Sequence, residues 1–182
     1  EMSEAELPRF WKDDGKVRMD GQGNEFSPEQ LPYQDYITHF LSDTSGIFTE
    51  PYKVALEAGT HKISITPING EFNLKHIILG APEVMRDYDA SDKPDLEFYK
   101  GKEIVIEGEK ALYKNNYWLV SLSDISSPNV SPADPIHTKV NYIGGSNWKH
   151  TGDTIAWNVD ITQAGYYQIG FSYRQNLVLN GS

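Results

Sequence analysis

Apolar and polar residues alternate with a period of two in the C-terminal part of the chain. Every second residue is aliphatic or aromatic in residues 154–161, and the same holds in residues 167–173. Because successive side chains of a β-strand point to opposite faces, this alternation predicts two half-buried strands. The segment Gln163-Ala164-Gly165 between them predicts a hairpin turn. The expected buried sets are Ile155, Trp157, Val159 and Ile161 in the first strand and Tyr167, Ile169, Phe171 and Tyr173 in the second.

Shorter segments earlier in the chain follow the same pattern, and helix signals are scarce. The further strand candidates are residues 52–56, 61–65, 72–79, 103–111 and 139–142. Ser27-Pro28-Glu29-Gln30 has the form of a helix-capping box, but Pro32 follows at once and limits any helix to a turn or two. Many short strands separated by turns that contain Gly and Pro predict an all-β fold, an antiparallel β-sandwich or a barrel.

Two irregular stretches indicate how the chain is divided. Residues 85–94 are acidic and rich in turn-forming residues, which is typical of a linker. Residues 121–135 combine Ser, Asp and Asn with prolines and predict a long surface loop. We therefore expect a first part in residues 1–82, a linker in residues 83–100 and a last part in residues 101–182.

Charge and composition exclude several classes of function. The 182 residues carry a net charge of −10, from 16 Lys and Arg against 26 Asp and Glu. Such a charge repels a phosphate backbone, so we expect no nucleic-acid partner. The absence of cysteine excludes disulfides and cysteine zinc sites. No apolar run approaches the roughly 18 residues of a membrane span, so we expect no membrane insertion. The start of the chain lacks a hydrophobic signal region, so an export signal would have been removed or would lie upstream.

The sequence contains no recognisable catalytic motif. It has no Gly-x-Ser-x-Gly, no phosphate loop and no dinucleotide fingerprint, and its five histidines lack metal-ligand spacing. Paired carboxylates can hydrolyse glycosides, but nothing marks one of the many acidic residues as a proton donor. We therefore expect a protein that is not an enzyme.

Three motifs in the C-terminal half carry a resemblance to a known family. They are IEGEKA at residues 106–111, GDTIAWNV at 152–159 and GYYQIGFSYR at 165–174. They resemble the opening strand and two later strands of carbohydrate-binding modules of families six and thirty-five, which are galactose-binding-like jelly rolls. The resemblance implies a non-catalytic jelly-roll sandwich that binds an oligosaccharide or polysaccharide. It also implies a secreted, extracellular or cell-surface bacterial protein, such as a solute-binding lipoprotein, with neighbouring modules as partners.

The N-terminal half resembles the end of the same kind of module. Residues 54–65 are similar to its penultimate hairpin, and residues 72–79 are similar to its last strand. The two halves therefore occur in reversed order, and more than one explanation is open. The chain is cut from two tandem modules, or its halves pack as one permuted sandwich, since neither half buries its sheet alone. A second copy of the chain is another source of the missing strands.

Glu107 and Glu109 form the candidate metal site. Two residues apart on a strand, they point to the same face roughly 7 Å apart and repel each other unless a cation or solvent relieves them. The resemblance implies that these two glutamates help hold a structural calcium, which prefers oxygen ligands. Lys75 stands where the family has an aspartate, so its ammonium is an alternative partner for them. Two solvated glutamates without any metal are the remaining alternative.

The candidate ligand-binding residues lie in loops that carry aromatic or polar side chains. Sugars bind to flat aromatic faces with amide or charged groups close by. Trp148 is the expected platform, although a ring that covers the end of the core is the alternative. Tyr142 is the residue of the set that best suits the core. The full set is Trp148, Asn147, Tyr142, Arg174 and Asn176. If these residues bind no sugar, the chain is instead a structural or protein-interaction spacer in a surface protein.

Overall fold

Eight short strands and one 3-10 turn make up the regular structure of the residues that the computed structural model describes, which are 7–42, 50–81 and 95–175. The chain divides into two units. One contains Glu1–Leu7 and Gln34–Tyr88, and the other contains Pro8–Tyr33 and Asp89–Ser182. This grouping differs from the expected division at residues 82 and 100, because residues 8–33 pair with strands from the C-terminal half.

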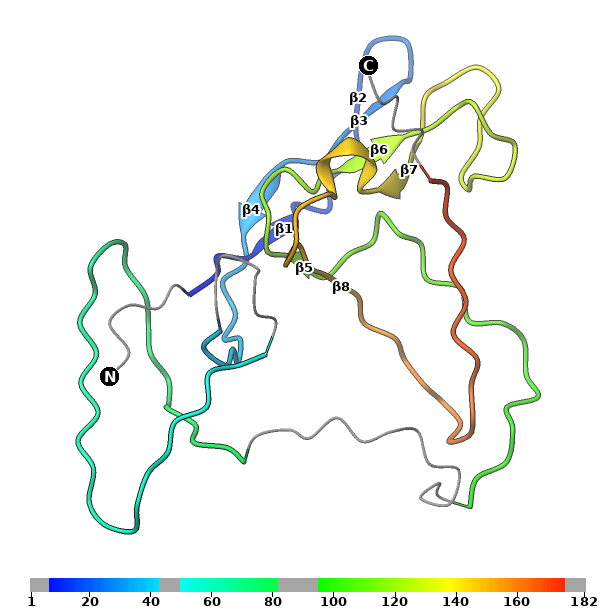
Figure 1. Cartoon of the computed structure of the whole chain (residues 1–182). Helices are drawn as coiled ribbons and strands as arrows, with labels where there is room; N and C mark the ends of the chain where they lie inside the picture. Colours follow the sequence, from blue (N-terminus) through cyan, green and yellow to red (C-terminus); the bar gives the residue numbers. More distant parts are fainter. Residues whose placement is uncertain (1–6, 43–49, 82–94, 176–182) are drawn as a thin grey trace, which may run out of the picture. The chain divides into compact units, whose positions relative to one another are not determined.

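Four of the strands form one antiparallel sheet (Figure 1). Their order across the sheet is β4 (Gln30–Pro32), β1 (Trp11–Asp13), β5 (Tyr113–Lys114) and β8 (Ile155–Ala156). Trp11 faces Pro32 on one side and Lys114 on the other, and Lys114 in turn faces Ile155. The sheet therefore joins three segments that lie far apart in the sequence.

Two further antiparallel pairs complete the strands of the described residues. β2 (Arg18–Met19) pairs with β3 (Glu25–Phe26), and β6 (Ser121–Ser123) pairs with β7 (Val140–Ile143). The 3-10 turn η2 (Gly145–Asn147) follows β7 directly. The described residues are thus nearly all β with antiparallel pairing, which confirms the expected all-β class.

The core of the larger unit is small and partly polar. Among the described residues, Leu119 and Ile155 are its buried apolar residues, and Lys114 is also fully buried. The Lys114 ammonium forms an ion pair with Asp13. The Asp13 carboxylate also accepts hydrogen bonds from Gln30 Nε2 (2.6 Å) and Ser121 Oγ (2.7 Å). Because these four residues come from β1, β4, β5 and β6, the polar cluster ties the four-stranded sheet to the β6–β7 pair.

Several predicted strands have no partner strand among the described residues, and the predicted strand 103–111 contains a turn at residues 108–109. In residues 154–161 only Ile155–Ala156 is paired; Ile155 is buried and Trp157 half-buried, whereas Val159 and Ile161 are exposed. Residues 103–111, 52–56, 61–65 and 72–79 contain no assigned strand. In residues 167–173, Ile169, Phe171 and Tyr173 are 83–85% exposed. Alternation predicts that a segment suits a sheet, but a strand also needs a partner for its backbone groups.

The end of the expected linker is part of the larger unit. Phe98 forms an isolated parallel bridge with Tyr166, in which Tyr166 N donates to Glu97 O (2.9 Å) and Tyr99 N donates to Tyr166 O (3.0 Å). The rings of Tyr99 and Tyr167 stack with centroids 4.5 Å apart. These contacts anchor residues 97–99 to the start of the predicted strand 167–173.

Candidate functional site

The loop that carries Trp148 is shaped by two consecutive glycines. Gly144 has a φ of +107° and Gly145 a φ of +63°, both in the region that side chains rarely adopt. A Cβ atom on Gly144 would lie 3.0 Å from Cε3 of Trp148, so the indole ring packs directly against the bare backbone. A Cβ atom on Gly145 would lie 3.5 Å from the hydroxyl oxygen of Tyr142. The Gly144-Gly145 pair therefore brings Tyr142 and Trp148, two of the predicted residues, to the same turn.

Asp153 fixes the far end of this loop. Its backbone carbonyl accepts a hydrogen bond from the indole Nε1 of Trp148 (3.3 Å), and its Oδ2 accepts one from the backbone N of His150 (3.1 Å). Its own backbone N donates to the carbonyl of His150 (3.1 Å). The indole of Trp148 is thus held at its edge and on one face, while 45% of the residue stays exposed. Such an arrangement keeps an aromatic face available without freedom to rotate.

A second loop, residues 115–118, is joined to the first by hydrogen bonds. Asn115 Nδ2 donates to the carbonyl of Gly152 (2.7 Å), and Asn115 Oδ1 accepts from Thr154 N (2.7 Å). Asn116 Nδ2 donates to Asp153 Oδ1 (3.0 Å), and Asn116 Oδ1 accepts from the backbone N of Trp118 (3.0 Å). These loops lie at the ends of β5 and β8, which pair directly, so the sheet explains why they meet.

The second loop presents aromatic rings of its own. Trp118 is 67% exposed, and its ring meets the ring of Tyr117 edge to face at 5.2 Å. Tyr117 in turn meets Trp11 of β1 edge to face at 5.0 Å. Offset and edge-to-face contacts are the favoured geometries of aromatic pairs. Tyr117 and Trp118 belong to no sequence motif, and only the pairing of β5 with β8 brings their loop to the Trp148 loop.

The other predicted ligand residues have different surroundings. Asn147 lies in η2 and is half-buried. Arg174 donates from Nη1 to Asp124 Oδ2 (2.7 Å) and to Ser126 Oγ (2.8 Å), so its guanidinium ties the chain to the loop after β6. Asn176 lies outside the described residues. The structure therefore unites Tyr142, Asn147 and Trp148 in one turn and places Arg174 at another loop.

The chain matches no protein-family model, no curated protein and no solved structure. Within the part of the chain that the structure describes, no helix has the length and apolar character needed to cross a membrane. We therefore infer the function of this chain from the geometry of its own residues.

Glu107 and Glu109 are half-buried and border a turn in which Lys110 N donates to Glu107 O (3.1 Å). Oε2 of Glu109 is buried and has no hydrogen-bond partner among the residues that the structure describes. Burial raises the pKa of Glu109 above its usual range, and the nearby charge of Glu107 raises the pKa further. Lys75 belongs to the other unit, where its ammonium lies 5.4 Å from the ring centroid of Tyr36. Among the described residues, no group of three or more His, Asp or Glu side chains is arranged to hold a metal, and calcium at Glu107 and Glu109 stays a prediction.

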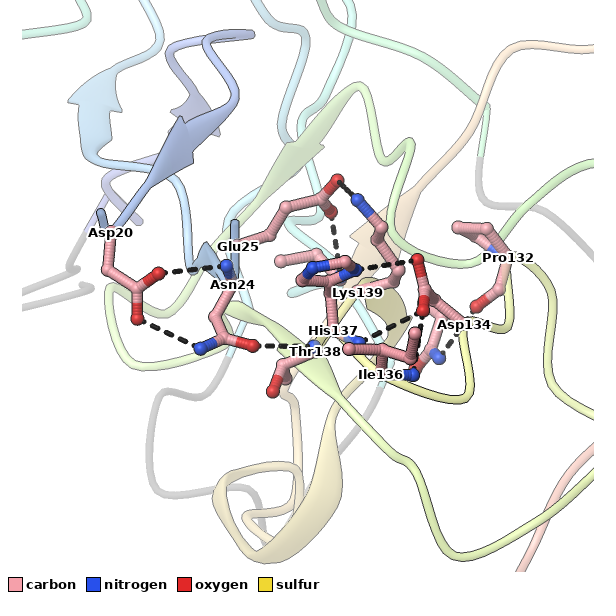
Figure 2. A network of polar contacts seen from close by, with 11 residues as sticks. Asp20, Asn24, Glu25, Pro132, Asp134, Ile136, His137, Thr138 and Lys139 are labelled. Atoms are coloured by element: carbon pink, nitrogen blue, oxygen red, sulfur yellow. Dashed lines mark hydrogen bonds and ion pairs between the residues drawn. The ribbon is translucent and has the colours of Figure 1, made fainter. Parts of the chain in front are cut away.

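A separate polar network lies at the start of β7 (Figure 2). The Glu25 carboxylate accepts hydrogen bonds from Lys139 Nζ (2.9 Å) and Val140 N (3.0 Å), and the bond from Lys139 lowers the pKa of Glu25. Asp134 accepts bonds from the backbone N of Ile136 and of His137 (2.8 and 3.0 Å) and faces His137 Nδ1 at 3.1 Å. These bonds, led by that from the His137 backbone, lower the pKa of Asp134 to about 2.

Asp134, His137 and Lys139 of this network line a small open hollow. The hollow has both carboxylate and aliphatic side chains, but Asp124 and Asp134 are already bonded within the protein. The hollow therefore belongs to the packing of the loop after β6, and the exposed aromatic loops are the better candidate site. The residues that line the hollow are Asp124, Ile125, Ser127, Val130, Ala133, Asp134, His137, Lys139 and Asn141.

Proposed function

We propose that this chain is a non-catalytic carbohydrate-binding module of a secreted or cell-surface bacterial protein, built as a galactose-binding-like jelly roll. The observation that carries the proposal is the fixed and exposed indole of Trp148 in a loop with polar neighbours. The apolar face of a sugar ring packs on such a ring, and hydroxyl groups bond to amides and phenols beside it. Tyr142 and Asn147 supply these groups in the same turn.

Rigid aromatic residues favour binding because little side-chain entropy is lost when the ligand arrives. The Trp148 ring is held by its Nε1 bond and by its packing on Gly144. The net charge of −10 favours an uncharged partner over a polyanion such as nucleic acid. Both properties suit an oligosaccharide or polysaccharide.

A second candidate function has an observation of its own. The alternating residues Ile169, Phe171 and Tyr173 are 83–85% exposed, which is unusual for three large side chains so close together in one segment. Exposed apolar patches of this kind mark contacts with other proteins or modules. The alternative is therefore a structural or protein-interaction spacer that contacts neighbouring modules and binds no sugar.

A glycan microarray followed by calorimetry with the strongest hit tests the proposal. We expect binding of at least one oligosaccharide or polysaccharide by the wild type and its loss in Trp148→Ala. Tyr52→Ala is the matched control, because Tyr52 is 43% exposed and lies in the other unit. An array with no signal above background would contradict the carbohydrate proposal and favour the spacer function. Equal loss of binding in Tyr52→Ala would show that the effect of Trp148→Ala is not specific.

A further inference from the structure

The tryptophans of the two joined loops are linked by two intervening side chains. Trp148 donates from its indole to the backbone of Asp153, and the carboxylate of Asp153 accepts from Asn116. The other end of the Asn116 amide accepts from the backbone of Trp118. Each amide and carboxylate atom in this chain of bonds has a single defined partner, so the positions of the two loops depend on each other.

The ring of Trp118 packs against one neighbouring ring and is otherwise largely exposed. Tyr117 holds the ring edge to face, and Trp11 holds Tyr117 in the same way. Trp118 is the most exposed of the four tryptophans, at 67% against 45% for Trp148, whereas Trp11 and Trp157 are half-buried. A large aromatic ring that packs on one edge and stays exposed on the rest is suited to contact a second apolar face.

The surroundings of the two rings are open and not enclosed. Trp118 and Trp148 are 67% and 45% exposed, and the two hollows lined by residues 124–141 include no residue of the 115–118 or 145–154 loops. A site that captures the end of a sugar chain encloses it in a pocket, whereas exposed rings can contact a chain that continues in both directions. The geometry thus favours a ligand that lies across the surface.

We propose that Trp118 and Trp148 are two platforms of one site, and that this site binds internal segments of a linear oligosaccharide or polysaccharide. This inference rests on the proposed function and adds Trp118 as a second contact residue. Asn116 is a positioning residue, because it touches both loops and aligns the platforms. A chain that is long enough to lie on both rings binds more tightly than a short one through the second contact.

Oligosaccharides of two to six units from the polysaccharide with the strongest microarray signal are titrated by calorimetry. We expect affinity to rise with chain length and to be unchanged when the reducing end is converted to an alditol. Trp118→Ala and Trp148→Ala should each weaken binding of the hexasaccharide by about tenfold or more, as the loss of a tryptophan contact does at protein interfaces. Trp118→Tyr retains a platform and should restore most of the affinity. Asn116→Leu should weaken the hexasaccharide and leave the disaccharide unchanged.

The results separate this inference from the proposed function. Wild-type binding that Trp148→Ala abolishes and Trp118→Ala leaves intact would overturn the two-platform site and retain a carbohydrate-binding module. Disaccharides that bind as tightly as hexasaccharides, or a loss of affinity on reduction of the chain end, would likewise overturn it. No binding of any array glycan by the wild type overturns both. Circular dichroism and thermal unfolding of each variant, compared with Tyr52→Ala, establish that the variants are folded.

Discussion

We predict that the buried ion pair in the polar cluster around Asp13 stabilises the folded protein. Lys114 is fully buried, and the side chain of Asp13 is 12% exposed, so their ion pair is shielded from water. Replacing Lys114 by Met keeps the aliphatic stem and removes the ammonium, which leaves a buried carboxylate without its cation. Removing one partner of a buried ion pair costs about 3–5 kcal/mol. Gln30 and Ser121 still donate to Asp13, so we expect the lower end of this range, about 3 kcal/mol.

Urea unfolding followed by tryptophan fluorescence measures this effect in the relevant unit. Trp11, Trp118, Trp148 and Trp157 all belong to the unit of residues 8–33 and 89–182, and the chain has no other tryptophan. With an m value of about 2 kcal/mol/M, a loss of about 3 kcal/mol moves the midpoint down by roughly 1.5 M urea. The m value itself should not change, because the variant unfolds the same surface.

Two control variants test whether the buried ion pair causes the loss of stability. Lys100→Met removes an exposed lysine whose ammonium lies 3.3 Å from Glu97, and such a surface pair contributes about 0–1 kcal/mol. The double variant Asp13→Asn, Lys114→Met removes both charges and should recover part of the lost free energy. A Lys114→Met protein as stable as Lys100→Met, or a double variant less stable than Lys114→Met, would show that the ion pair does not hold the sheets together.

Three further outcomes are expected. Gly144→Ala should cost about 1–3 kcal/mol of stability and weaken glycan binding in calorimetry, because its φ of +107° is strained for alanine and a Cβ atom there meets the Trp148 ring at 3.0 Å. The pKa of Asp134 falls from 3.8 to about 2 on folding, so its hydrogen bonds stabilise the protein above pH 4, and this contribution is lost as the pH falls towards 2. Urea unfolding between pH 2 and 5 should therefore show a smaller pH dependence of stability in Asp134→Asn than in the wild type. Because burial raises the pKa of Glu109, its negative charge destabilises the folded protein at pH 7, so Glu109→Gln should unfold at a higher urea concentration than the wild type when both are measured in EDTA. At the predicted calcium site, added calcium should stabilise the wild type and leave the stability of Glu109→Gln unchanged.

Local pattern predicted the class of structure and the loop that carries Trp148. Period-two alternation and the scarcity of helix signals indicated an all-β chain, and the described residues have this character. Trp148 was expected in a loop, and the structure places it in a turn formed by Gly144 and Gly145 with Tyr142 against the same turn. Each of these features depends on residues close together in the chain, so a short stretch of sequence contains the information.

Features that depend on distant residues were not predictable in this way. Lys114 is a type of residue that is rarely buried, and only its partner Asp13, 101 positions away, explains its place in the core. Asn116 and Asp153 are 37 positions apart, and nothing near either residue indicates that they bond. Arg174 suited a ligand role by its place after a strand, yet its guanidinium bonds Asp124 and Ser126. A single sequence does not specify which of its strands are neighbours, and these contacts follow from that choice.

The unpaired segment 168–173 connects the proposed function with its alternative. It is anchored at one end by the bridge between Phe98 and Tyr166 and at the other by the ion pair of Arg174 with Asp124. Between these anchors, its backbone forms no hydrogen bond with the described residues, and its apolar side chains are exposed. An extended strand with open edges and an apolar face is a template for pairing with another strand. The proposed glycan site and this segment use different loops of the same unit, so the proposed function and its alternative are compatible in one protein. Substituting Phe171 should therefore affect association with a neighbour and leave glycan affinity at Trp148 unchanged.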